Sequence, residues 1–96
     1  MVKRIQNFNY IFLFYDIKEE RVQKVFKVCK KYLFHHQMSV FRGPITPSKF
    51  LELKSELEKV INKKEDFISV IMLLNEKSYE EESIGTKKKD AESLFL

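Results

Sequence analysis

The sequence predicts an α+β domain in which one β-sheet carries two helices on one of its faces. Three observations support this fold class: two long apolar runs typical of strands, two segments with apolar residues at helical spacing, and an alternating order of strands and helices. The chain has 96 residues, enough for one such domain and too few for two. A chain of this length cannot enclose a deep substrate cavity, so we expect any site to be shared between subunits.

Composition excludes several classes of protein. With one cysteine, the chain cannot form an intramolecular disulfide or a cysteine-rich zinc site. Its two glycines exclude a glycine-rich phosphate loop and a dinucleotide-binding fingerprint. No apolar run approaches the roughly 18 residues that span a bilayer, and the N-terminus lacks a signal-peptide cleavage site. We therefore expect a cytoplasmic protein without a membrane partner.

The first strand is predicted at residues 10–15, where six consecutive apolar or aromatic residues indicate burial on both faces. Asp16 ends this strand, and a helix follows. The apolar residues of this helix recur at the spacing of a single helix face: Val22, Val25, Phe26, Cys29 and Leu33. Cys29 is therefore expected in the core.

The same helix holds the chain's excess of positive charge. Residues 18–31 contain six basic and two acidic residues, a local sum of +4 that equals the net charge of the whole chain. Lys24, Lys27 and Lys31 fall on the side opposite the apolar face. Such a stripe is either a solvated helix face or a contact for nucleic-acid phosphates, and both interpretations remain open.

Residues 35–45 are expected to be extended, either as one bent strand or as a tight hairpin. Thr46 and Pro47 then predict the start of a second helix, as its N-cap and first residue, and this helix should stop near Asn62. Its buried face is formed by Phe50, Leu53, Leu57, Val60 and Ile61. The apolar run at residues 67–74 predicts a further inner strand.

With right-handed crossovers, this order of elements gives a ferredoxin-like split βαβ sandwich. Both helices then cover one face of the sheet. Because the expected inner strands are apolar on both sides, a monomer would expose an apolar patch of a kind that is rare on soluble proteins. We infer a homodimer packed sheet to sheet.

The composition changes after residue 74, so we assign residues 1–86 to the domain and residues 87–96 to a C-terminal tail. Residues 83–86 are predicted to form a short edge strand, in this subunit or on its partner. The tail has too few apolar residues for a core of its own, and we expect it either to dock on a partner or to be disordered.

Asp16 is the most informative carboxylate, because it follows a central strand where loops converge. Asp16 and Glu19 loosely match a capping box, so Asp16 either caps the following helix or binds a ligand. A single aspartate is a poor metal site, but a two-fold dimer supplies two copies near its axis. Such a pair suits Mg²⁺, or Mn²⁺, acting on a phosphodiester.

Other polar or aromatic residues lie near Asp16 in the predicted fold. His35 and His36 are adjacent, so on a strand they point to opposite faces and do not form one metal site. Tyr15 and Phe41 are expected to pack in the sheet. Arg21 and Arg42 are candidates for phosphate contacts or, equally, surface arginines.

Several of these segments together resemble one family. They are Tyr15-Asp16, Glu20-Arg21-Val22, the Gln-Met-Ser-Val-Phe-Arg-Gly stretch at residues 37–43, Leu53-Lys54, and Ile84-Gly85-Thr86. In this combination the chain is similar to the CRISPR-associated protein two family over residues 10–86. The most specific segment is residues 37–43, at its distance from Tyr15-Asp16.

The resemblance implies a ferredoxin-like homodimer with divalent-metal-dependent endonuclease activity and a role in inserting new spacers into a CRISPR array. It implies that Asp16 is the metal ligand and that Tyr15, Arg21 and Phe41 match positions linked to activity. Lys24, Lys27, Lys31 and Arg42 would contact duplex phosphates, and the tail would contact CRISPR-associated protein one, the integrase. Some family members carry arginine where this chain has His35, which weakens the expectation of efficient single-stranded RNA cleavage.

Three other functions remain open at the level of sequence. One is a free-standing ribonuclease toxin of the virulence-associated protein D type, which would arrest growth without an integrase neighbour. Another is a non-catalytic DNA-binding adaptor in which Asp16 only caps a helix. A ferredoxin-like dimer that binds a small regulator is less favoured, because the chain lacks a glycine-rich ligand loop.

Overall fold

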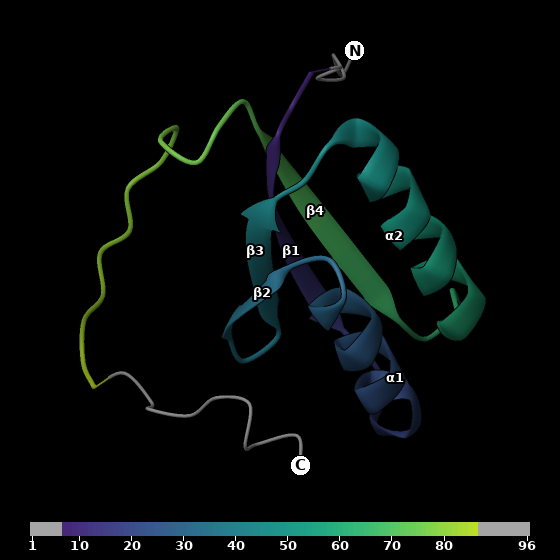
Figure 1. Cartoon of the computed structure of the whole chain (residues 1–96). Coiled ribbons are helices and arrows are strands. Elements are labelled where there is room, and N and C mark those ends of the chain that lie inside the picture. The colour runs from purple at the N-terminus through teal and green to yellow at the C-terminus, as the bar shows by residue number, and fades with distance from the viewer. Residues whose placement is uncertain (1–6, 87–96) are drawn as a thin grey trace.

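The computed structural model describes residues 7–86, and the predicted tail at residues 87–96 lies outside them. The elements follow one another as β1 (Tyr10–Asp16), α1 (Glu19–Lys30), β2 (Phe34–Gln37), β3 (Val40–Pro44), α2 (Pro47–Val60) and β4 (Phe67–Leu73). The four strands form one antiparallel sheet in the order β2-β3-β1-β4 (Figure 1). The predicted α+β, ferredoxin-like arrangement is confirmed.

One expected position in the sheet is wrong. Residues 67–74 were expected to form an inner strand, but β4 lies at the edge and pairs with β1 alone, while β3 occupies the second inner position. The crossover through α2 carries the chain from β3 over β1 to the far edge. The helices account for the apolar residues on one side of β4, whereas on the other side Phe67 and Ile71 are left exposed.

Residues 34–44 form the tight hairpin, the second of the two expected alternatives. Strands β2 and β3 are joined through Met38 and Ser39, and Met38 adopts a positive φ of 44° at the turn. Gly43 lies where β3 passes close to the start of β2, since a Cβ added there would lie 3.3 Å from Phe34 Cδ2. A side chain at this position would therefore require the exposed Phe34 ring to shift by a few tenths of an ångström.

The two helices begin and pack largely as their sequences indicate. Thr46 caps α2 by accepting a hydrogen bond from the Lys49 amide at 3.2 Å, and Pro47 is the first helical residue. In α1, Val25, Phe26 and Cys29 are buried, so the predicted place of Cys29 in the core is confirmed. Burial raises the pKa of the Cys29 thiol to about 12.

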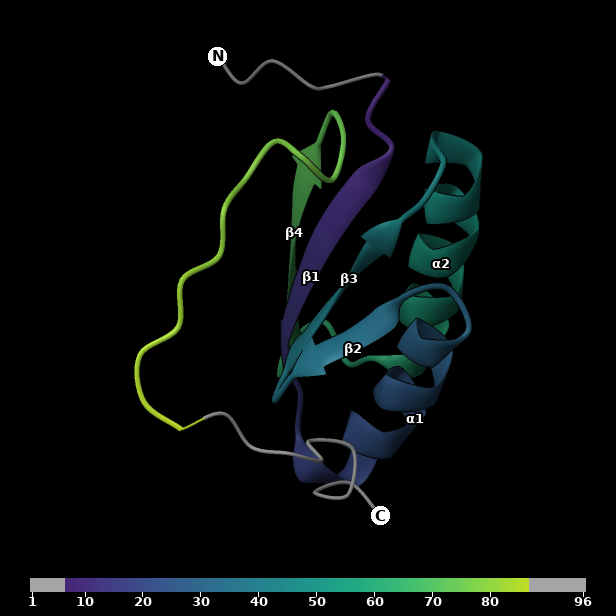
Figure 2. The same cartoon turned by 60° about the vertical axis from the view of Figure 1, so that its left-hand side comes forward.

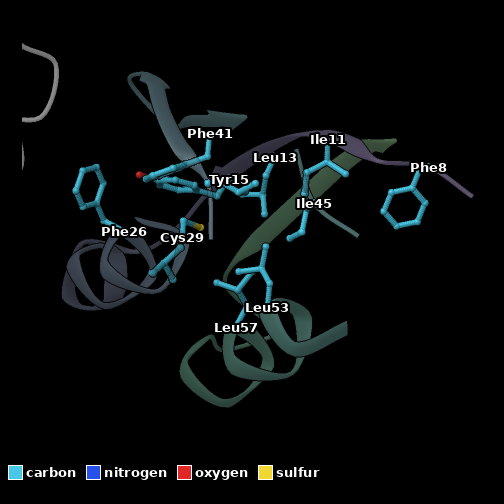
Figure 3. Close-up of a cluster of buried hydrophobic side chains, with 12 residues drawn as sticks. Phe8, Ile11, Leu13, Tyr15, Phe26, Cys29, Phe41, Ile45, Leu53 and Leu57 are labelled. Carbon is cyan, nitrogen blue, oxygen red and sulfur yellow. The ribbon is translucent and has the colours of Figure 1, made fainter. Parts of the chain in front are cut away.

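Figure 2 shows both helices on one side of the sheet and residues 75–86 on the other. We call these sides the helix face and the open face. The core lies under the helix face, where β1 contributes Ile11, Leu13 and Tyr15 and α2 contributes Leu53 and Leu57 (Figure 3). Alternate residues of β1, including Phe12 and Phe14, point to the open face.

Residues 83–86 form no strand within the part of the chain that the structure describes. The predicted edge strand is therefore absent from a single copy. Pairing of this segment with a second copy stays a prediction. Among residues 7–86, no helix has the length and apolar character needed to cross a membrane.

Candidate active site at the end of strand β1

Asp16 is the last residue of β1 and is exposed. Tyr15 points into the core, so alternation along the strand places Asp16 on the open face. Its backbone pairs with Phe67, the first residue of β4. Within residues 7–86 the Asp16 carboxylate makes no hydrogen bond or ion pair, and it is therefore available to a ligand.

The expectation that Asp16 caps α1 is wrong. The N-cap of α1 is Lys18, and no side chain of the N-cap closes the helix. The carboxylate of Asp66 serves this end instead, because its Oδ1 accepts the Lys18 amide hydrogen at 2.9 Å. A cap supplied from a distant loop leaves both oxygens of Asp16 unused.

Asp66 lies just before β4, and its side chain is fully buried. Its Oδ2 accepts hydrogen bonds from the Asn62 amide at 2.8 Å and from Arg21 Nε at 2.6 Å. Arg21 Nη2 also donates to Asp66 Oδ1 at 3.2 Å. The Arg21 guanidinium and the two amides hold the pKa of Asp66 well below its usual range.

Arg21 was a candidate for phosphate contact, but its guanidinium is directed at acidic side chains of its own chain. Besides Asp66, it contacts Glu65 at 2.8 Å through Nη2 and Glu20 at 3.5 Å through Nη1. These partners raise the Arg21 pKa, and only 19% of the side chain is exposed. Arg21 is therefore an internal ion-pair partner in this structure, and its guanidinium is directed at Asp66, Glu65 and Glu20.

Tyr15 and Phe41 pack in the sheet, as expected, and their side chains lie in the core on the helix face. Their ring centroids are 6.1 Å apart, and Phe41 also packs against Phe26 at 5.2 Å (Figure 3). Among residues 7–86 the buried Tyr15 hydroxyl has no hydrogen-bond partner, and burial raises its pKa to about 12, with Cys29 adding to the effect. Strand alternation directs both rings away from Asp16, so they support the strand from beneath.

The two histidines point to opposite faces, as predicted. The His35 ring lies on the helix face, 4.9 Å from the centroid of Phe26, and its Nε2 is 2.7 Å from the Met38 carbonyl oxygen. His36 lies on the open face, where its Nδ1 accepts from Arg42 Nε at 2.8 Å. Its Nε2 therefore carries the hydrogen that faces Glu81 Oε2, 2.8 Å away.

The predicted nucleic-acid contacts divide between the two faces. Lys24 and Lys27 are exposed on α1, and Lys31 at its C-terminal end is exposed but paired with Glu56. Arg42 is on the open face and donates to the Tyr10 hydroxyl at 2.7 Å. The structure does not bring Arg42 together with the lysines, because it lies on the opposite side of the sheet.

Sequence reasoning missed two contributors to this region. The sequence offers one signal for Asp66, since it is an acidic residue directly before an apolar strand. Its burial could not be predicted, because it is paired with Arg21, which is distant in sequence. Tyr79 lies in a polar segment, and no sequence pattern predicted that it would contact the sheet. Its ring lies 4.7 Å from Phe12, so residues 75–86 run over part of the open face.

A hollow of about 660 Å³ lies at the other end of β1, between Tyr10, Tyr32 and the start of α2. Tyr10 is the first residue of β1 and Asp16 is the last, so this hollow is not part of the site around Asp16.

A divalent metal needs more than one protomer offers at Asp16. Within residues 7–86, no three side chains of His, Cys, Asp or Glu come together in a way that could hold a metal ion. Asp16 alone gives one free carboxylate. Mg²⁺ commonly binds through one or two carboxylates, waters and substrate phosphates, so two copies of Asp16 would fit its requirements.

Comparisons with known proteins agree with these features. The family described as CRISPR associated protein Cas2 matches residues 9–82. A curated relative from Thermodesulfovibrio yellowstonii, named CRISPR-associated endoribonuclease Cas2 3, is 47% identical over 79 residues, covering 82% of this chain and 90% of the relative. A Thermotoga maritima relative, named CRISPR-associated endoribonuclease Cas2, is 34% identical over 86 residues, covering 90% of this chain and 99% of the relative.

Solved structures show the same likeness. A crystal structure titled as cas2 superposes with a TM-score of 0.77 at 29% identity, covering 83% of this chain and 90% of the other. The Streptococcus pyogenes Cas2 crystal structure at pH 6.5 superposes with a TM-score of 0.70 at 29% identity, covering 79% of this chain and 99% of the other.

Proposed function

Because the chain belongs to the CRISPR-associated protein Cas2 family, we propose that it is a homodimeric, metal-dependent endonuclease that also binds nucleic acid during spacer acquisition. The observation that carries this proposal is the free, exposed carboxylate of Asp16 on the open face at the end of β1. The relatives are named endoribonucleases, which favours RNA as the first substrate to test. Duplex DNA is the second.

The open face supports the dimer. Phe67 is 65% exposed and Ile71 is 51% exposed, and strand register places both side chains on the same face as Asp16. Packing two copies about a two-fold axis would cover these residues, because such an interface uses the same surface on both subunits. The same packing would bring the two Asp16 carboxylates toward each other.

The paired carboxylates would hold Mg²⁺ or Mn²⁺ between the subunits. When bound, the ion would supply Lewis-acid stabilisation of the phosphate and a more acidic water. Asp16 would provide the negative charge and fix the position, while the apolar side chains around it would exclude bulk water. Two unbridged carboxylates would repel each other, so the dimer itself favours a bound cation.

Lys24 and Lys27 support the binding part of the proposal. They are exposed on α1, on the side of the molecule away from the dimer face. These lysines would displace the cations condensed on nucleic-acid phosphates, which gives affinity without base specificity. This arrangement suits a small subunit that holds duplex DNA for CRISPR-associated protein one, with the C-terminal tail as the contact to that integrase.

The test of the nuclease is Mg²⁺-dependent cleavage of labelled single-stranded RNA and duplex DNA by wild type and by Asp16→Asn. We expect the variant to lose at least about 100-fold in rate, because an amide cannot replace a charged metal ligand. Glu19→Gln is the matched control, since it removes an exposed carboxylate three residues away and should leave the rate within about twofold of wild type. Chelator should abolish the wild-type activity.

Equal activity of wild type and Asp16→Asn would overturn the metal site. Absence of activity in both, with duplex binding retained, would instead favour the DNA-binding adaptor. Cleavage of RNA that arrests growth without any integrase would favour the free-standing ribonuclease toxin.

The binding part is tested separately by replacing Lys24, Lys27 and Lys31 together with glutamine. We expect weaker duplex binding and a smaller slope of log affinity against log salt, by roughly one unit for each phosphate contact removed. The control replaces Lys49, Lys54 and Lys59 of α2 in the same way. If both triple variants reduce binding equally, net charge rather than the α1 surface is responsible.

A further inference from the structure

The connection between Asp16 and α1 is very short. Only Ile17 separates Asp16 from Lys18, the residue at which α1 is capped. We propose that Asp66, held by Arg21, is a positioning residue that sets the Asp16 carboxylate for divalent-metal binding. This inference rests on the proposed function and names side chains for which sequence reasoning had no such role.

The backbone is anchored on both sides of Asp16. On the N-terminal side, the Tyr15 amide donates to the Ser39 carbonyl at 3.1 Å, which attaches β1 to the β2–β3 turn. On the C-terminal side, the Lys18 amide donates to Asp66 Oδ1 at 2.9 Å. The direction of the Asp16 side chain therefore depends directly on Asp66.

Asp66 is well suited to hold that second anchor. Its side chain is fully buried, and the next residue, Phe67, is the strand partner of Asp16. The β4 segment thus contacts the Asp16 connection twice, through the Phe67 ladder position and through the Asp66 carboxylate. A shift of Asp66 would move both contacts together.

Arg21 keeps Asp66 in place. It comes from the first turn of α1 and reaches the connection before β4, where Nε is 2.6 Å from Asp66 Oδ2 and Nη2 is 2.8 Å from Glu65 Oε1. Because the planar guanidinium contacts both oxygens of Asp66, it fixes the rotation of the carboxylate as well as its charge. Arg21 therefore acts on the site through Asp66 rather than by contacting substrate.

A shared metal site makes this positioning matter. Two carboxylates from different subunits must meet at one ion, and metal sites tolerate only small deviations in ligand distance. Any displacement of the Asp16 connection occurs twice in a symmetric dimer. Groups that orient metal ligands typically change metal affinity by about 10- to 100-fold when they are replaced.

The same helix provides a matched control at its other end. There Glu56 of α2 accepts hydrogen bonds from Lys31 and from the Tyr32 hydroxyl, which ties the C-terminal end of α1 to α2. Glu56→Gln weakens this attachment of α1 without touching the Asp16 connection. Comparison of the two variants separates positioning of Asp16 from general loosening of α1.

The experiment measures Mn²⁺ binding to the purified dimer by electron paramagnetic resonance, which reports free Mn²⁺ directly. For Asp66→Asn we expect the dissociation constant to rise by about tenfold or more, because an amide nitrogen cannot accept the hydrogen bonds that the carboxylate accepts. For Glu56→Gln we expect a change below about twofold. Arg21→Lys keeps the charge without the planar fork and should give an intermediate loss.

The outcomes distinguish this inference from the proposed function. If Asp16→Asn abolishes Mn²⁺ binding while Asp66→Asn and Arg21→Lys bind as wild type does, positioning by Asp66 is wrong and the metal site stands. If Asp16→Asn binds Mn²⁺ as wild type does, the proposed metal site itself is wrong. Should Asp66→Asn fail to fold by circular dichroism, Arg21→Lys alone decides, and an unchanged dissociation constant for it overturns the inference.

Discussion

The two faces of β1 differ in what covers them, although they are built from alternate residues of one strand. On the helix face, Ile11, Leu13 and Tyr15 are buried under the helices (Figure 3). On the open face, Phe12 and Phe14 are partly exposed, and Asp16 is exposed. The helix face stabilises the protomer, while the open face carries the residues available for assembly and chemistry.

The open face is itself divided. Over one part, Tyr79 packs on Phe12 and Glu81 contacts His36, so the segment that runs along this side of the sheet covers it at these two points (Figure 2). Over the part formed by β4, Phe67 remains exposed opposite Asp16, and Ile71 remains exposed farther along the strand, opposite Phe12. The part left uncovered is the part nearest the proposed metal site, which is what a site shared between two copies requires.

The largest effect on stability is expected from truncation on the helix face. Leu13 is completely buried, and Leu13→Ala should lower the free energy of unfolding by about 3 kcal/mol. Ile71→Ala on the open face should lower it by less than about 1 kcal/mol in the isolated protomer, because half of that side chain is already exposed. Urea denaturation at low protein concentration measures both, and equal losses would contradict the division between the faces.

The next effect concerns assembly. Ile71→Asp should weaken dimerisation by at least about tenfold, because it places a charge in the apolar face that the second copy would bury. Sedimentation velocity over a range of concentrations measures the shift. Leu51→Asp is the control, since Leu51 is 63% exposed on α2, away from the open face. Dissociation caused by Leu51→Asp but not by Ile71→Asp would place the interface on the helices instead.

The smallest effect is the pH dependence of the Asp66 contact. The pKa of Asp66 is lower in the folded protein than in the unfolded chain, where aspartate titrates near 3.9. This stabilisation is present above about pH 4 and is lost as the pH falls below that value and Asp66 takes up a proton. Thermal unfolding of wild type between pH 2 and 5 should show this loss, and Asp66→Asn should show a shallower dependence. Parallel curves would mean that other carboxylates account for the acid sensitivity.

Local patterns predicted the elements well because each depends on neighbouring residues. The apolar spacing of α1 and the Thr46-Pro47 start of α2 are local signals, and the structure confirms both. The position of β4 at the sheet edge is not local, because it depends on which strand the second crossover passes. An apolar sequence alone does not distinguish an inner strand from an edge strand that leaves apolar side chains exposed on one face, as β4 does.

The site was predicted only in part, because some of its contacts join residues that are distant in sequence. Asp16 was placed correctly at the end of β1, but the capping alternative failed because Asp66, 50 positions later, accepts the hydrogen bond at the start of α1. Arg21 looked like a phosphate ligand because its partner Asp66 is distant in sequence. Long-range ion pairs leave no periodic signal, so only the folded chain identifies them.

By itself, the sequence determined the fold class, the buried place of Cys29, and the opposite directions of His35 and His36. These follow from the periodicity of helices and strands, which the order of residues contains directly. The metal-ligand role of Asp16 stays a prediction from its place at a strand end and from the family resemblance. Only the tertiary structure decided that Asp66 replaces Asp16 at the start of α1, that Arg21 faces inward, and that Arg42 lies opposite the lysines. Those contacts join residues far apart in the chain, so they form only when the strands and helices have packed together.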